Sequence, residues 1–234
     1  MIAPAMSNSN CPGNINQKSY LCHDWQDIQI HETMRYCILS LALMLGILTS
    51  CTDTQKETAM EQNETLENLK TRRAVRSYQD RMPEMELIEK VVEAGTYAPT
   101  GMGRQSPIIV AVTDKAVRDR IARLNAGVMG GDKDPFYGAP VVLVVLADRN
   151  VPTHVYDGAL VMGNLLNAAH AVGLGSCWIH RAKEVFDSEE GKALLKEWGI
   201  EGDYEGIGNC ILGYTAGEYP TPAPRKAGYV HFVK

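Results

Sequence analysis

An unbroken apolar run, Val141–Leu146, restricts the possible folds of this chain more than any other feature. It lies between Pro140 and Asp148 and contains no polar residue. A strand with one face in water alternates apolar and polar residues, so a continuous apolar run predicts a strand that is buried on both faces. The domain therefore needs helices on both sides of its sheet.

The rest of the chain from about residue 65 supplies further elements. Apolar spacing predicts a short helix that includes Leu66 and ends near Tyr78. Further helices are predicted over 83–95, 114–124 with Asp114 as the N-cap, 156–172 and 189–198, and strands over 108–112, 176–179 and 207–212, with an extended end at 229–233. This order indicates an α+β domain with three αβα layers over residues 65–234.

The first part of the chain has the pattern of a targeting segment. Met34 and Arg35 precede an apolar stretch, Tyr36–Leu48, which ends in Thr49-Ser50-Cys51. Such a stretch is typical of a secretory signal peptide. The alternative is an amphipathic or buried helix that happens to end in a cysteine.

Leu48-Thr49-Ser50-Cys51 resembles the bacterial lipoprotein box, in which the cysteine carries the lipid. We therefore expect a disordered start-site extension at 1–33, with Met34 competing with Met1 as the natural start. A signal peptide at 34–50 and a solvated tether at 51–64 follow it. This arrangement places the domain on a membrane, facing the periplasm, through a lipid on Cys51 alone. A cytoplasmic location is the alternative if the signal is not used.

Composition and motifs exclude several classes of function. The net charge of −5 argues against a general nucleic-acid binder, because phosphate neutralisation needs an excess of lysine and arginine. No C-x-x-C pair or close histidine pair is present, so no metal site is expected. The glycines at 173 and 175 are followed by Trp178 where a dinucleotide fingerprint needs glycine. Cys177 and Cys210 lie in apolar strands and are predicted to be buried thiols.

Two segments could contact an anionic, planar ligand. Arg72-Arg73-Ala74-Val75-Arg76, here called the cationic segment, places Arg72 and Arg76 on one face if it is helical. Two guanidinium groups on one face suit a phosphate, although a solvated charged face is the simpler interpretation. Ala98–Gln105, here called the glycine loop, lets backbone approach a flat ligand, or is an ordinary helix–strand connection.

Four motifs in this order resemble the nitroreductase family of flavin enzymes over about Leu66–Val233. They are Arg72–Tyr78, Ala98–Gln105, Gly173–Ile179, and Ile211–Tyr214 followed by Pro224-Arg225-Lys226. The resemblance implies a nitroreductase-like fold with a mixed central sheet. It also implies an intertwined homodimer that binds FMN at its interface.

The resemblance also assigns roles to residues. Arg72 with Arg225 or Lys226 would hold the phosphate, and Arg76 would lie near the pyrimidine edge of the flavin. Ile179 and His180 would approach the central edge of the ring. No catalytic side chain is implied, because bound flavin carries the chemistry. The remaining implied FMN contacts are Arg73 and Ala74 and, from the partner subunit, Pro99, Thr100, Gly101, Met102 and Gln105.

The implied activity is transfer of two electrons from a donor to a small acceptor. NAD(P)H is the usual donor in the family, and a quinone, a nitroaromatic compound or an activated alkene is the expected acceptor. Export would separate the domain from NAD(P)H. Either the donor is therefore not a nicotinamide, or the signal peptide is not used. The alternative function is a lipid-anchored flavin-binding protein without turnover.

Overall fold

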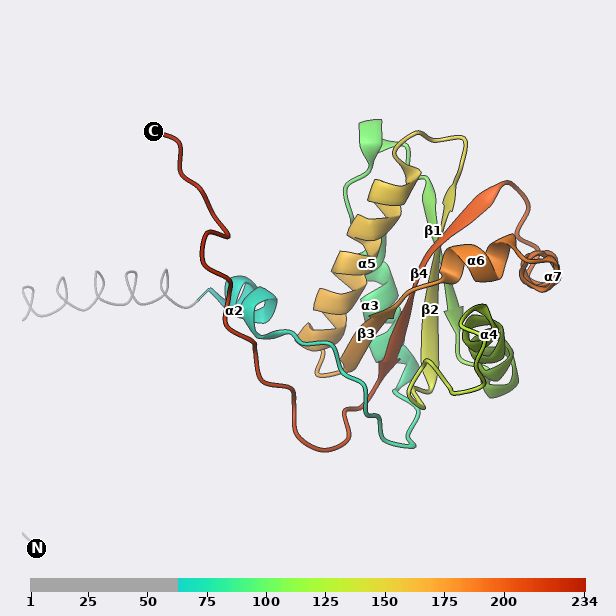
Figure 1. Cartoon of the computed structure of the whole chain (residues 1–234), viewed down its shortest axis with the longest axis horizontal. Helices are drawn as coiled ribbons and strands as arrows, with labels where there is room; N and C mark the ends of the chain where they lie inside the picture. Colours follow the sequence, from blue (N-terminus) through green and yellow to red (C-terminus); the bar gives the residue numbers. More distant parts are fainter. Residues whose placement is uncertain (1–62) are drawn as a thin grey trace, which may run out of the picture. The chain divides into compact units, whose positions relative to one another are not determined.

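A four-stranded sheet forms the centre of the domain in the computed structural model, which describes residues 63–234 (Figure 1). The strands are β1 (Pro107–Val112), β2 (Val141–Asp148), β3 (Gly175–Ile179) and β4 (Tyr204–Gly213). Their order is β1-β2-β4-β3, and each neighbouring pair is antiparallel. A parallel bridge between Ala74 and Ser176 at the β3 edge makes the sheet mixed. The predicted signal peptide and Cys51 lie outside the described residues.

The central strand β2 is buried on both faces, which confirms the prediction for Val141–Leu146. Every residue from Val141 to Ala147 has no exposed surface. Side chains alternate between the two faces of a strand. Val142, Val144 and Leu146 therefore enter one hydrophobic cluster, and Val141, Leu143 and Val145 enter the other.

One face of the sheet is covered by α3 (Met85–Thr96) and α5 (His154–Ala171), with α2 (Glu64–Thr71) beside α5 (Figure 1). Helices α3 and α5 approach each other closely at Gly95. A Cβ at this position would lie 2.6 Å from Cδ2 of Leu165. The missing side chain therefore allows the two helices to share one core with β2.

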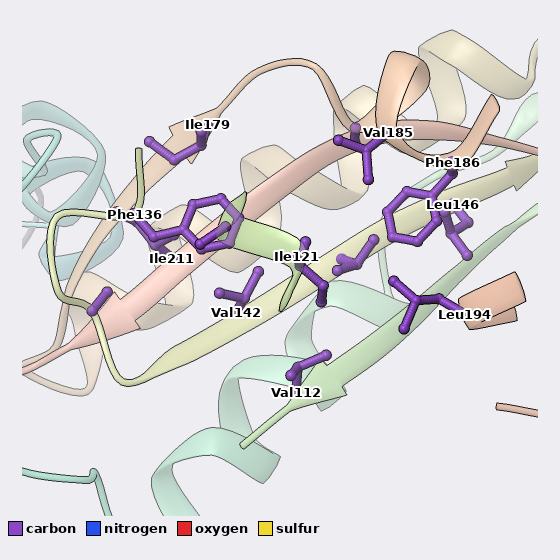
Figure 2. Close-up of a cluster of buried hydrophobic side chains, with 14 of the residues drawn as sticks. Val112, Ile121, Phe136, Val142, Leu146, Ile179, Val185, Phe186, Leu194 and Ile211 are labelled. Carbon is purple, nitrogen blue, oxygen red and sulfur yellow. The ribbon is translucent and has the colours of Figure 1, made fainter. Parts of the chain in front are cut away.

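The other face is covered by α4 (Lys115–Val128), α6 (Ala182–Asp187) and α7 (Glu189–Glu197). Figure 2 shows this cluster, in which Ile121 of α4, Phe186 of α6 and Leu194 of α7 meet side chains from the strands. Asp114 caps α4 as predicted, since its carboxylate accepts a hydrogen bond from the Val117 amide at 2.9 Å. Helix α6 was not predicted, because six residues are too few to show a clear period.

The prediction of a helix that ends near Tyr78 is wrong, because α2 ends at Thr71. The chain after α2 binds the edge of the sheet instead. The Val75 amide donates to the Ser176 carbonyl at 2.9 Å, and the Gln79 amide donates to the Tyr214 carbonyl at 2.9 Å. Val75 itself is buried, so hydrophobic burial and strand hydrogen bonds outweigh helix propensity here.

The chain after Gly213 forms no helix, as predicted, and it makes one isolated bridge between Thr215 and Tyr78. The predicted extended end at 229–233 has no strand partner among residues 63–234, and its apolar side chains are exposed. None of the helices between residues 63 and 234 has the length and apolar character that crossing a bilayer requires.

Candidate functional site

The cationic segment is held at the edge of β3 rather than on a helix. Val75 is its buried anchor, and Ala74 bridges Ser176. Both Arg72 and Arg76 lower the pKa of the Cys177 thiol, which burial otherwise raises. Both guanidinium groups therefore act on the same part of β3. The predicted helix that would place Arg72 and Arg76 on one face does not form, and their common role at a ligand stays a prediction.

Arg72 and Arg76 carry charges that no acid of the described chain compensates. The ion pairs found within residues 63–234 include neither of these two arginines. Arg73 differs, because its Nη1 donates to the carbonyls of Lys70 and Arg72 while its Nε is buried without a partner. The segment thus offers two free guanidinium groups to an anion.

A polar cluster that the sequence did not indicate joins the cationic segment to α5 and to the C-terminal tail. The His170 ring is 2.9 Å from the Thr71 hydroxyl and 3.1 Å from the Tyr219 hydroxyl. Tyr219 also accepts the Arg73 amide at 2.8 Å and stacks on His170. Burial lowers the pKa of His170, and Arg72 and Arg73 lower it further, so the ring is kept neutral beside two cations.

The glycine loop connects α3 to β1 and lies against the start of α5. Its backbone is left-handed at Met102, Gly103 and Gln105, with φ values of 55°, 66° and 50°. The Gly101 amide donates to Oδ1 of Asp157 at 2.9 Å, and the Gln105 amide donates to the Thr100 hydroxyl at 3.0 Å. Met102 remains 81% exposed.

A cavity of about 710 Å³ opens beside the glycine loop. Thr100 and Gln105 line it, whereas Pro99, Gly101 and Met102 do not. Most of the remaining wall is apolar or aromatic and comes from α3, the residues that follow it, β1 and α5, namely Val92, Tyr97, Ala98, Pro107, Ile108, Ile109 and Val161. The lining suits a flat, largely apolar group with a polar edge near Gln105.

Ile179 and His180, which were expected to approach a flavin ring, have different environments at the end of β3. The side chain of Ile179 is buried in the core cluster shown in Figure 2, so only its backbone is available. His180 is exposed, and its carbonyl accepts Nδ2 of Asn125 at 2.8 Å. Asn125 is fully buried and therefore fixes the turn that presents His180.

Arg225 and Lys226 are exposed, and their described contacts are with their own tail. Arg225 donates to the Ala223 carbonyl at 2.7 Å, and the Lys226 ammonium lies 5.5 Å from the Tyr229 ring centre. The contacts within residues 63–234 do not bring either of them to Arg72. Their role at a phosphate stays a prediction.

The cationic segment and the glycine loop lie at opposite ends of α5. The former reaches His170 through Tyr219, and the latter contacts Asp157 directly. At a rise of 1.5 Å per residue, these two positions are about 20 Å apart along the axis. The structure of one subunit therefore does not bring these two predicted parts of the site together.

Comparison with known proteins decides the family. The Nitroreductase family model matches residues 69–130 and 127–214. The chain belongs to the nitroreductase family. The match contains the cationic segment, the glycine loop and strands β1 to β4.

Relatives and solved structures agree with this family. Two archaeal proteins, provisionally named NADH dehydrogenase/NAD(P)H nitroreductase, are similar to this nitroreductase family member. The protein from Methanothermobacter thermautotrophicus is 32% identical over 48% of this chain and 59% of its own length. The protein from Archaeoglobus fulgidus is 30% identical over 66% of this chain and 87% of its own length.

A nitroreductase structure with bound FMN from Bacteroides fragilis superposes with a TM-score of 0.69 at 27% identity, covering 74% of this chain and 100% of that one. The nitroreductase-like α+β fold expected from the sequence is thereby confirmed.

The cysteines and the acidic side chains of this nitroreductase domain were also predicted from the sequence to form no site. Cys177 and Cys210 are buried, as predicted, and their strands point them into opposite clusters of the core. No three acidic, histidine or cysteine side chains of residues 63–234 are grouped as metal ligands.

Proposed function

We propose that this protein is an FMN-dependent oxidoreductase that accepts electrons from NAD(P)H and delivers them to a small organic acceptor. Quinones, nitroaromatic compounds and activated alkenes are the acceptor classes. The observation that carries the proposal is the pair of uncompensated guanidinium groups, Arg72 and Arg76, within a nitroreductase family domain. Their charge suits the phosphate of FMN and the electron-rich edge of its ring.

The residues of the described chain fit this nucleotide. Arg72 would hold the phosphate, and Arg76 would face the pyrimidine edge of the ring. Thr100 and Gln105 supply polar groups at the cavity beside the glycine loop. When bound, FMN would supply the hydride chemistry, so the protein has to bind and orient rather than attack.

We propose further that the site is completed by a second subunit. The separation of about 20 Å between the cationic segment and the glycine loop supports this arrangement, since the two cannot both border one small ring system within a subunit. The exposed apolar side chains near the glycine loop and on α5 also support it, because large exposed apolar patches mark interfaces. These side chains are Tyr97, Met102, Val155, Tyr156 and Leu160.

The lipid anchor at Cys51 and the periplasmic location are also proposed, and they rest on the sequence pattern at 34–51. In that location a non-nicotinamide compound would replace NAD(P)H as the donor. Membrane fractionation of cells that express the wild-type chain or a Cys51→Ser variant tests them. We expect the wild type in the membrane fraction and the variant released from it. An unlipidated wild type in the cytosol would refute the anchor and would restore direct access to NAD(P)H.

The absorption spectrum of the purified protein tests the central proposal. We expect two visible flavin bands, which bleach on addition of NADH or NADPH and return when a quinone or a nitro compound is added. Bleaching by dithionite without reoxidation by any acceptor would instead indicate a flavin-binding protein. A colourless protein that takes up no added FMN would refute the proposal.

A further inference from the structure

The glycine loop combines an unfavourable backbone conformation with few hydrogen bonds of its own, chiefly those that Thr100 accepts from the amides of Gln105 and Gly103. Met102 and Gln105 are left-handed although neither is glycine. A Cβ makes this conformation unfavourable, so it persists only where the surroundings impose it. The Met102 side chain is 81% exposed and therefore cannot impose it by packing.

Asp157 supplies a restraint from outside the loop, in the first turn of α5. It is buried, with 3% of its surface exposed. Its Oδ1 accepts the Gly101 amide at 2.9 Å, and its Oδ2 accepts the hydroxyls of Ser106 and Thr153, each at 2.9 Å. Gly101 and Ser106 bracket the left-handed residues, so one carboxylate closes the turn at both ends.

The environment keeps this carboxylate charged. Burial acts to raise the pKa of Asp157, but hydrogen bonds from Gly101, Ser106 and Thr153 outweigh it and leave the pKa below its usual value. The position in the first turn of a helix also favours a negative charge. An ionised acceptor makes stronger hydrogen bonds than a neutral one.

The contact also requires a glycine. A Cβ at Gly101 would lie 2.4 Å from the hydroxyl oxygen of Thr153, well inside contact distance. The loop can therefore reach Asp157 only because position 101 has no side chain.

We infer that Asp157 is the positioning residue of the glycine loop, which holds Thr100, Met102 and Gln105 in the conformation that contacts the isoalloxazine ring. The inference rests on the proposed function for the identity of the ligand. The restraint on the loop itself does not depend on a ligand. Asp157 acts through the loop and has no role in proton or electron transfer.

Hydrogen exchange of the protein without added FMN tests the restraint directly. We expect the amides of residues 101–106 to exchange about tenfold faster in Asp157→Ala than in the wild type, because a hydrogen bond to a charged group is lost. Ser106→Ala, which removes one donor, should show a smaller change and serves if Asp157→Ala does not fold.

Asp134→Ala is the matched control. Asp134 is also a carboxylate that restrains a loop, since it accepts the amides of Phe136 and Gly138, each at 2.9 Å. Its loss should accelerate exchange at residues 136–138 and leave 101–106 unchanged. Wild-type exchange at 101–106 in Asp157→Ala would overturn the inference.

Flavin binding provides the second readout. We expect Asp157→Ala to bind FMN about tenfold more weakly and to shift its visible bands and midpoint potential, whereas Asp134→Ala changes none of these. Asp157→Asn keeps an acceptor for Gly101 and should recover part of the affinity.

Faster exchange with unchanged affinity, spectrum and potential would overturn the role at the ring. A wild-type protein that takes up no FMN would refute the proposed function, while the exchange data would still decide whether Asp157 holds the loop.

Discussion

Val75 shows how a single buried residue places charged neighbours. Its side chain is 1% exposed, and its amide is bound to Ser176. Burying a valine side chain contributes about 1.5–3 kcal/mol, which is enough to fix the local chain against the sheet edge. Arg72 and Arg76 on either side of it are then held near β3, although their guanidinium groups form no ion pair within residues 63–234.

Replacement of Arg72 by alanine tests this placement. We expect Arg72→Ala to weaken FMN binding by one to two orders of magnitude, because each charge-assisted hydrogen bond contributes about 1.5–3 kcal/mol. The free energy of unfolding should stay near that of the wild type, since no ion pair of the described chain involves Arg72. Equilibrium titration with FMN and urea unfolding measure the two quantities.

Arg120→Ala is the control for this variant, since Arg120 pairs with Glu197 on the α4–α7 surface at 2.8 Å. It should leave FMN affinity unchanged. Equal flavin content in Arg72→Ala and wild type would remove Arg72 from the site.

Cys210 makes the stability of the fold depend on pH in the alkaline range. Burial raises the pKa of its thiol to about 12, whereas an unfolded cysteine titrates near 8.5. The folded state therefore keeps a proton that the unfolded state releases. Its contribution is fully present below about pH 8.5 and is lost as pH rises toward 12.

We expect the free energy of unfolding to fall by up to about 1.4 kcal/mol per pH unit above pH 9 through this group. Urea unfolding at pH 8 and pH 10 measures the slope in the wild type and in Cys210→Ala. The variant should have the shallower slope. Parallel slopes in the two proteins would show that the thiol is accessible in the folded state.

At the scale of elements, the ends of the helices depend on single side chains. Asp114 caps α4 through the Val117 amide, and the same role at α7 falls to Ser188, whose hydroxyl accepts the Gly191 amide at 3.0 Å. Both residues are of the types that cap helices well, and Ser188 also ends α6.

Loss of the α4 cap should therefore have a small, defined cost. We expect Asp114→Ala to lower the free energy of unfolding by about 1 kcal/mol, while Asp114→Asn, which can still accept the amide, loses much less. Urea unfolding of both variants at neutral pH measures the difference. Equal stability of the alanine and asparagine variants would argue against the cap.

At the scale of the whole molecule, the division of the proposed site between two subunits has a specific consequence. A mixed dimer of Arg72→Ala and Asp157→Ala subunits would contain one site with both defects and one site with neither. We expect a mixture of the two variants, after subunit exchange, to contain a fraction of sites that bind FMN with wild-type affinity, which neither variant has alone. FMN titration of the mixture, compared with each homodimer, measures the recovery.

A mixture that binds no better than the average of its components would refute a site shared between subunits. Sedimentation of the wild-type protein provides an independent measurement. A monomer at micromolar concentration would likewise refute a site shared between subunits. Flavin binding by such a monomer would still support the oxidoreductase proposal, so the two proposals can fail separately.

The sequence by itself determined the local elements of this protein. The apolar run at 141–146 identified β2, because a strand buried on both faces has apolar residues at every position. The helical spacing of apolar residues at 156–172 identified α5, because a helix buried on one face repeats them about every 3.6 residues. It also indicated the cationic segment and the glycine loop as places for an anionic, planar ligand.

Only the tertiary structure decided how those segments are held and where they lie. The cationic segment, predicted as a helix, instead binds β3, about 100 residues further along the chain. Asp157 accepts the amide of Gly101, which is 56 residues away in the sequence. Neither contact produces a periodic pattern in the sequence. The sequence around Asp157 does not show that it accepts hydrogen bonds from Gly101 and Ser106. Hydrogen bonds between distant residues are set by the packed arrangement of the elements, which no window of sequence contains.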